Sequence, residues 1–201
     1  MSTLSTTNLK NASSGSNNIV LGTDGSTTIP TLSATTITGT TIQGTIKSGT
    51  AVASTSGVAI DFTGLPSWVK RVTVMFDGVS TSGTSNWLVQ LGDSGGIESL
   101  NYVSYSALLG ASSVNGGAGF TAGFGLSTAA AAATINGQIS LSLLNSNTWT
   151  MQGMVARGDV GNGILACGSK ALSATLDRIR VTTVNGTDTF DAGSINILWE
   201  G

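Results

Sequence analysis

Two strand-like runs close this chain, and they constrain its fold more than any other feature. Ile179 and Val181 alternate with polar residues in the first run, and Ile195, Ile197 and Trp199 largely do so in the second. An alternation with a period of two is typical of a β-strand that buries one face. We therefore expect the C-terminal part of the chain to be built from strands.

The residues between these two runs have two interpretations. Asn185-Gly186 tolerates the positive φ angles of a type I′ turn, which would bring Val181 opposite Phe190 on one face. Alternatively, a longer loop over residues 185–193 joins the strands. Both interpretations predict a C-terminal β-hairpin that closes a sheet, and the sequence does not choose between them.

Further short strand-like runs fill the preceding residues. We predict strands at Gly57–Phe62, Trp68–Gly78, Trp87–Leu91, Tyr102–Leu109, Ile135–Leu144, Thr148–Val155 and Gly163–Ser169. Asn145–Asn147 predicts a hairpin between the fifth and sixth of these. Ser112–Gly125 is glycine-rich and predicts a loop, and Ala129–Ala133 is too short for a persistent helix, so a loop or strand edge is expected there. Such spacing is typical of an antiparallel β-sandwich, of which the jelly roll is a common viral form.

Residues 1–55 differ in composition from the rest. They contain three charged residues and no aromatic residue, so a lone chain has little there from which to build a core. A short strand is expected at Ile19–Leu21, followed by a turn at Asp24-Gly25 and a second short strand. We therefore divide the chain into an N-terminal segment, residues 1–55, and a C-terminal domain, residues 56–201.

A weak repeat, TTITG-TTIQG-TIKSG, occupies residues 35–49. Ile37, Ile42 and Ile46 recur at intervals of five and four residues, each followed within three residues by glycine. Isoleucine in a threonine-rich segment favours strands, and short repeats usually stack or intertwine because they cannot bury an apolar face alone. We expect a β-rich shaft in which three chains each contribute one isoleucine per layer. The alternative is a flexible linker.

Several long blocks carry a family resemblance. They are GVAIDFTGLPSWVKRVTVMFDGVSTSGTSNWLVQLG (Gly57–Gly92), NSNTWTMQG (Asn145–Gly153) and GSKALSATLDRIRVTTVNGTDTFDAGSINILWE (Gly168–Glu200). Over roughly residues 50–201 the chain resembles the C-terminal domain of bacteriophage tail-fibre and related virion-appendage proteins. The resemblance implies a homotrimeric β-sandwich head displayed on a virus particle.

This resemblance sets the expected function. It implies a structural virion protein whose residues 1–30 attach to other virion proteins and whose head contacts the host surface. The resemblance does not name the receptor, and we expect a glycan because of the aromatic residues described below. Such a protein is assembled in the host cytoplasm and released by lysis. The alternative is a capsid decoration protein or head fibre with a stabilising or weakly adhesive role.

Charge and hydropathy exclude two kinds of partner. The formal charge is −2, and the eight Lys and Arg residues are spread along the chain, whereas nucleic-acid binding needs a concentrated basic face. No apolar run approaches the roughly 18 residues of a membrane span. The N-terminal residues lack the basic and apolar regions of a secretory signal. We expect neither nucleic-acid binding nor membrane insertion.

The residue types argue against catalysis and cofactor binding. The chain has no histidine, which removes the commonest general base and the usual zinc ligands. Half of the ten carboxylates stand beside glycines, where Asp stabilises turns. Asn185, Asp188 and Asp191 could offer oxygens to calcium, but their spacing does not match an EF-hand. We expect a protein that is not an enzyme and has no metal site and no cofactor.

The candidate receptor-binding residues are aromatic. Tyr102, Tyr105, Phe120 and Phe124 lie in the least regular part of the predicted domain, and exposed aromatic rings on loops of a rigid scaffold are suited to stacking on sugars. Packing in a trimer interface is the alternative role. The four tryptophans lie in strand runs, where we expect burial.

Overall fold

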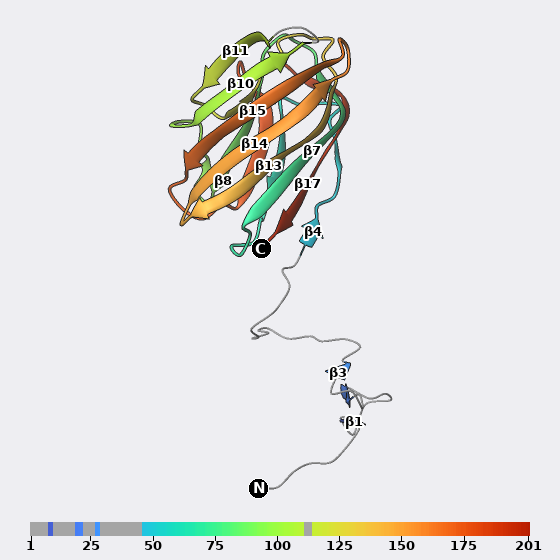
Figure 1. The fold of residues 1–201 in the computed structure, drawn as a ribbon, viewed down its shortest axis with the longest axis vertical. Helices are drawn as coiled ribbons and strands as arrows, with labels where there is room; N and C mark the ends of the chain where they lie inside the picture. Colours follow the sequence, from blue (N-terminus) through green and yellow to red (C-terminus); the bar gives the residue numbers. More distant parts are fainter. Residues whose placement is uncertain (1–7, 10–18, 22–26, 29–45, 111–113) are drawn as a thin grey trace. The chain divides into compact units, whose positions relative to one another are not determined.

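The computed structural model describes residues 8–9, 19–21, 27–28, 46–110 and 114–201 (Figure 1). The chain divides into two units, Met1–Gln43 and Gly44–Gly201. In the first unit the described residues form an antiparallel sheet with the order β1-β2-β3, made of β1 (Asn8–Leu9), β2 (Ile19–Leu21) and β3 (Thr27–Thr28). The predicted pair of short strands is thus confirmed. Ile37 and Ile42 of the predicted shaft lie outside the described residues.

The second unit consists of two antiparallel sheets. The larger sheet contains β4 (Ile46–Ser48), β5 (Val52–Ala53), β7 (Arg71–Thr81), β10 (Val103–Leu109), β11 (Val114–Phe120), β13 (Ile135–Asn145), β14 (Thr148–Arg157), β15 (Asn162–Ala171) and β17 (Phe190–Glu200). Its order is β11-β10-β15-β14-β13-β7-β17-β4, and β5 also pairs with β17. The smaller sheet contains β6 (Ala59–Thr63), β8 (Trp87–Asp93), β9 (Gly96–Ile97), β12 (Phe124–Leu126) and β16 (Arg178–Thr183). Its order is β12-β8-β16-β6, and β9 also pairs with β8.

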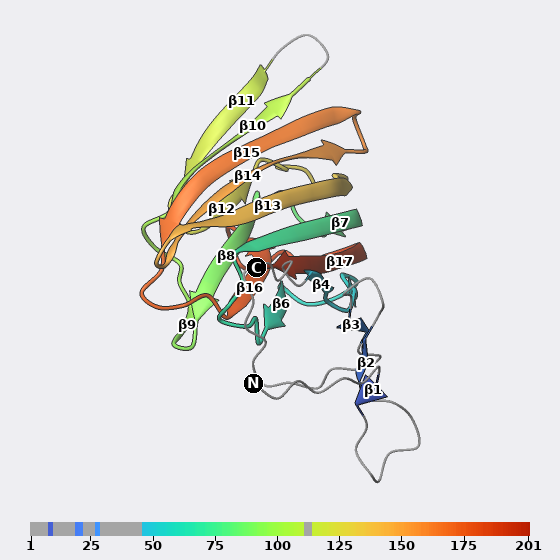
Figure 2. The same ribbon diagram turned by 60° about the horizontal axis from the view of Figure 1, so that its bottom comes forward.

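The two sheets form the layers of a β-sandwich-like fold, which Figure 2 shows from below. This confirms the all-β, antiparallel prediction, and no described residue lies in a helix. The core lies between the layers. Trp87 of the smaller sheet packs against Phe76 and Phe190 of the larger sheet, with ring centroids 6.2 and 5.7 Å apart. Trp149 is likewise buried, at 2% exposure, whereas Trp68 and Trp199 are only partly buried.

The predicted C-terminal hairpin is wrong. β16 pairs with β6 and β8 in the smaller sheet, whereas β17 pairs with β7 in the larger one. Val181 and Phe190 are both buried, but they come from opposite layers of the sandwich. The alternating pattern correctly predicted that each strand buries one face. Two strands in different sheets can bury those faces against each other as well as two paired strands of one sheet can.

The connection from β16 to β17 explains why the strands separate. The amide of Gly186, whose φ is 67°, donates to the Thr183 carbonyl at 3.1 Å and ends β16, and Asn185 in this described loop has no positive φ, so the turn is not type I′. The Asp188 carboxylate then accepts hydrogen bonds from Asn185 Nδ2 at 2.6 Å and the Ser85 amide at 2.9 Å. The loop is therefore fixed to the β7–β8 connection, which also crosses between the sheets.

The glycine-rich stretch is a second correction. Residues predicted as a loop form β11, which pairs with β10, and β12, which pairs with β8. A side chain on Gly117 would collide with the Tyr105 hydroxyl, and one on Gly125 would collide with the Phe120 ring. These glycines leave room for aromatic rings, so they belong to the sheets. Ala129–Ala133 forms no helix, as predicted, and the β13–β14 hairpin at Asn145–Asn147 is confirmed.

The larger sheet extends further toward the N-terminus than expected. β4 and β5 both pair with β17, with Lys47 opposite Trp199, so the second unit begins at Gly44. The expected boundary was residue 55. Ile46, predicted as a shaft residue, lies on β4 with 63% of its surface exposed.

Because Leu91 packs between the two sheets, we expect its substitution to lower the stability of the protein strongly. This side chain is fully buried in the core, so Leu91→Ala should lower the free energy of unfolding by about 2–5 kcal/mol through lost burial and a residual cavity. Urea denaturation measures this. The matched control is Leu100→Ala, which removes a side chain that is 70% exposed. It should change the free energy of unfolding by about 0.5 kcal/mol or less. Equal effects would contradict the described core.

Candidate functional site

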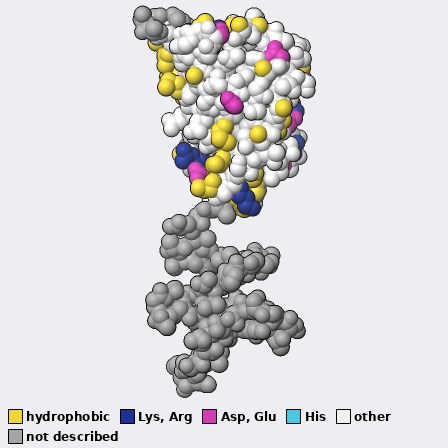
Figure 3. All heavy atoms as spheres, turned by 90° about the vertical axis from the view of Figure 1, so that its right-hand side faces the viewer, with side chains coloured by type: hydrophobic (Ala, Val, Ile, Leu, Met, Phe, Trp, Pro, Cys, Tyr) yellow, Lys and Arg dark blue, Asp and Glu magenta, His cyan; other side chains and the backbone are white. Residues whose placement is uncertain are grey.

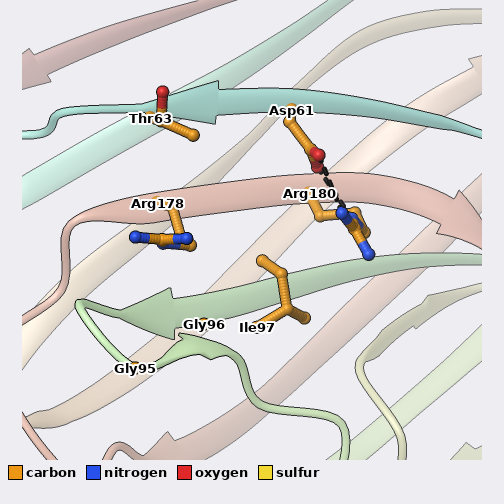
Figure 4. A pocket seen from close by; sticks show the side chains of 7 residues that line it. All are labelled: Asp61, Thr63, Gly95, Gly96, Ile97, Arg178 and Arg180. Carbon is orange, nitrogen blue, oxygen red and sulfur yellow. Dashed lines mark hydrogen bonds and ion pairs between the residues drawn. The ribbon is translucent and has the colours of Figure 1, made fainter.

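A pocket of about 420 Å³ opens on the outer face of the smaller sheet (Figure 4). We call it the arginine pocket, and it is lined by Asp61, Thr63, Gly95, Gly96, Ile97, Arg178 and Arg180. Its side chains come from β6, β16 and the β8–β9 hairpin. It thus joins residues that are distant in sequence on one rigid surface.

Strand alternation places the charged residues there. Along β6, Ile60 and Phe62 point into the core, so Asp61 and Thr63 point outward. Along β16, Ile179 and Val181 are fully buried, and Arg178 and Arg180 take the opposite face. The register sets Arg180 opposite Asp61 and Arg178 opposite Thr63. The pattern that builds the core therefore also builds the pocket.

Both arginines are held by carboxylates. Arg180 Nε and Nη2 donate to the two oxygens of Asp61 at 2.7 and 2.8 Å, and Arg178 donates to Asp177 through the same atoms at 2.6 and 3.1 Å. The bond to Asp61 raises the pKa of Arg180, and the bond to Asp177 raises that of Arg178. Bidentate pairs fix the planes of the guanidinium groups.

The charges around the pocket nearly cancel. Arg178 lies within electrostatic reach of three carboxylates, which belong to Asp177, Asp93 and Asp61. Each guanidinium group is paired with one carboxylate, Arg180 with Asp61 and Arg178 with Asp177, so neither positive charge is left unpaired. The pocket offers donors and acceptors to a ligand without favouring an anion.

The third wall of the pocket depends on glycine. Gly92 stands opposite Arg178 on one edge of β8 and opposite Ile97 on the other. A Cβ at Gly92 would collide with the Gly96 carbonyl and would lie 2.8 Å from Arg178 Cγ. The absent side chain leaves the hollow between the arginine and the hairpin.

Substitution of Gly92 should disturb this wall. Gly92→Ala forces the β9 hairpin to shift, so we expect a loss of about 1–3 kcal/mol in the free energy of unfolding, measured by urea denaturation. Gly119→Ala is the matched control, because its Cβ would meet nothing nearer than the Ser104 carbonyl at 3.8 Å. An unchanged stability of Gly92→Ala would show that the hairpin does not approach β8 as described.

The aromatic residues predicted to bind a receptor lie elsewhere. Tyr102, Phe120 and Phe124 are buried, with 2%, 8% and 0% of their surfaces exposed, so they cannot stack on a ligand in this structure. Tyr102 packs edge-on against Phe124 with ring centroids 5.1 Å apart, and its burial raises the pKa of its hydroxyl. Tyr105 is exposed, but it lies on β10 of the larger sheet. None of the four lines the arginine pocket.

The pocket residues left only a weak signal in the sequence. Arg178 and Arg180 alternate with buried residues in a chain that has 9% charged residues, so two such charges on one strand face were a usable sign. Their pairing with Asp61 depends on the β6–β16 register, which the sequence does not specify.

Other candidate chemistry has a structural explanation in the described residues. Asn185 and Asp188 bond to each other and to the loop backbone, and Asp191 bonds to Ser80. Within the described ranges no three His, Cys, Asp or Glu side chains gather in a way that could hold a metal ion. No helix that could cross a membrane occurs in the same residues.

No protein-family model, curated protein or solved structure matches the chain.

Two carboxyl groups beside the pocket have altered acidity. Hydrogen bonds from Ser173 and from the Gly95 amide lower the pKa of Asp93 below its usual 3.8. Partial burial raises the pKa of Glu98, but hydrogen bonds from Lys170 and Ser173 outweigh this and leave it below its usual 4.5. Both groups therefore bind a proton less readily in the folded protein.

The lowered pKa values of Asp93 and Glu98 predict that the folded protein loses stability in acid. A carboxyl group with a lowered folded pKa contributes stability that is complete above its unfolded pKa and is lost as the pH falls through the folded pKa. The urea midpoint should be level down to about pH 4.5 and then decline toward pH 3. The Asp93→Asn/Glu98→Gln variant should show a shallower decline. A variant that declines as steeply as the wild type would assign the acid sensitivity to other groups.

Proposed function

We propose that the protein is a bacteriophage virion protein, a tail fibre or appendage, whose second unit is a recognition head that binds a neutral glycan of the host surface in the arginine pocket. The observation that carries this proposal is the set of charge-balanced donors and acceptors around one open hollow. The proposed protein acts by binding, without catalysis.

The chemistry of the pocket is suited to sugar hydroxyl groups. Each hydroxyl both donates and accepts, and a fixed guanidinium–carboxylate pair such as Arg180–Asp61 offers both functions side by side. Thr63 adds a hydroxyl group, the Gly95–Gly96 backbone adds polar groups, and Ile97 adds an apolar wall. A hollow of about 420 Å³ is in the range of small-ligand sites. Balanced charge favours a neutral sugar over an acidic one.

The surface of the second unit supports contact with another copy of the chain, as the proposed trimer requires. On neighbouring strands of the larger sheet, Val103, Met154 and Leu165 expose 72%, 62% and 44% of their surfaces. Exposed apolar side chains on adjacent strands mark interaction surfaces. On the side of the unit drawn in Figure 3, Lys and Arg side chains lie mainly toward its lower end. The chain as a whole has only 9% charged residues, so contact with another copy desolvates few charges.

A jelly-roll-like connectivity and a β-rich shaft belong to the same proposal. The paired strands β7 and β17 lie in the larger sheet, and the paired strands β8 and β16 lie in the smaller one. The β7–β8 and β16–β17 connections therefore both cross between the sheets, as in Greek-key double sheets. The isoleucine repeat supports a shaft that joins the head to other virion proteins. Three heads on one shaft would raise the apparent affinity of weak sugar sites.

Glycan binding is tested on an array that pairs neutral oligosaccharides with sialylated or uronic-acid counterparts. The wild-type chain should bind neutral members, and Arg180→Ala and Asp61→Ala should each weaken binding at least about tenfold, because each leaves a charged partner unpaired. Arg71→Ala removes an exposed ion pair with Glu200 that does not line the pocket, and should bind as the wild type does. Preferential binding of acidic sugars would contradict the proposal.

Assembly is tested by multi-angle light scattering. The full chain should have a mass of three times 20.1 kDa. Val103→Lys/Leu165→Lys places charges on the exposed apolar strands and should shift the protein toward the monomer. A wild-type monomer at micromolar concentration would contradict the proposed trimer.

A further inference from the structure

A buried lysine lies behind the β8–β9 hairpin that forms one wall of the arginine pocket. Lys170 is on β15 of the larger sheet and is 4% exposed. Its Nζ lies 2.5 Å from Glu98 Oε2 and 5.3 Å from the centre of the Tyr102 ring. Glu98 directly follows β9. The ion pair therefore connects the larger sheet to the end of the hairpin.

Further hydrogen bonds continue from this ion pair. The second oxygen of Glu98 accepts from the Ser173 amide at 2.7 Å, and Ser173 Oγ donates to Asp93 at 2.6 Å, where the hairpin begins. The Tyr102 hydroxyl donates to the Glu98 carbonyl at 3.0 Å and accepts from the Leu91 amide at 2.7 Å. Both ends of the hairpin are thus held by side chains from outside it.

The position of Lys170 argues for a role other than stability. Its inward-facing neighbours on β15, Ile164 and Ala166, are apolar and fully buried. An apolar residue at position 170 would suit the core at least as well, because burying an ammonium group costs free energy that an ion pair only partly returns. A lysine at position 170 fixes one arrangement of the β8–β9 hairpin, because its partner Glu98 directly follows β9.

We propose that Lys170 and Glu98 are a positioning pair, which holds Gly95–Ile97 against the arginine pocket and thereby sets the affinity of its ligand. Neither residue lines the pocket, so both act through the hairpin. This inference rests on the proposed function only for its statement about affinity. The statement about the hairpin stands on the contacts of the described residues alone.

The decisive measurement is amide hydrogen exchange in the full chain without ligand. The Glu98 amide donates to the Leu91 carbonyl at 2.9 Å, so its exchange reports opening of the hairpin. The Lys170→Met/Glu98→Gln variant removes both charges together and leaves no unpaired ion. We expect exchange over residues 95–98 to accelerate at least about tenfold, with a thermal midpoint close to that of the wild type.

A second ion pair provides the matched control. Arg157 and Asp159 form a bidentate pair at 2.8 Å, with side chains only 11% and 15% exposed, away from this hairpin. Arg157→Met/Asp159→Asn should leave exchange over residues 95–98 unchanged. Unaltered exchange in the Lys170→Met/Glu98→Gln variant, or equal acceleration in the control, would overturn the positioning role.

A milder variant and a binding assay complete the test. Ser173→Ala removes the bond to Asp93 without touching a buried charge, so it should raise hairpin exchange a few-fold even if the double variant does not fold, and unaltered exchange would again overturn the role. Lys170→Arg keeps the charge and should retain most of the protection. On the array of neutral oligosaccharides, affinity should fall as exchange rises. If the wild type binds no sugar, the proposed function fails, and the exchange result still decides the positioning role.

Discussion

The packing of two sheets around a shared aromatic core is the constraint on which the rest of the structure depends. Trp87 of the smaller sheet packs against Phe76 and Phe190 of the larger one. The β7–β8 and β16–β17 connections both cross between the two sheets. Because β6 and β16 each commit one face to the interior, their other face is free for charged residues. The arginine pocket occupies that free face on β6 and β16.

The pocket combines two kinds of support. Strand pairing fixes Asp61, Arg178 and Arg180 on the sheet, while the β8–β9 hairpin has few ladder contacts of its own and relies on side-chain bonds from Lys170, Ser173 and Tyr102. The proposed recognition site would lose little conformational entropy on binding, because it lies on a rigid scaffold. The position of the hairpin wall therefore depends on the polar contacts behind it, from Lys170, Ser173 and Tyr102.

Much of the fold could be predicted from the sequence, and the site could not. Alternation and turn residues identified most strands and the β13–β14 hairpin, because these signals are local. The placement of β16 and β17 in different sheets depends on contacts with β6, β7 and β8, which alternation does not encode. Three of the four aromatic residues predicted to bind a receptor, Tyr102, Phe120 and Phe124, are buried for a related reason. Gly117 and Gly125 face aromatic rings across strands, so residues that suggested a loop belong to packed sheets.

The central claim is that the charge-balanced pocket on the smaller sheet recognises a neutral sugar. A crystal structure of the full chain with the neutral oligosaccharide that it binds most tightly would test this most directly. The account predicts a sugar ring between Arg178 and Ile97, with its hydroxyl groups bonded to Asp61 and Arg180. A sugar bound elsewhere, for example beside Tyr105 on the larger sheet, with the arginine pocket empty, would contradict it.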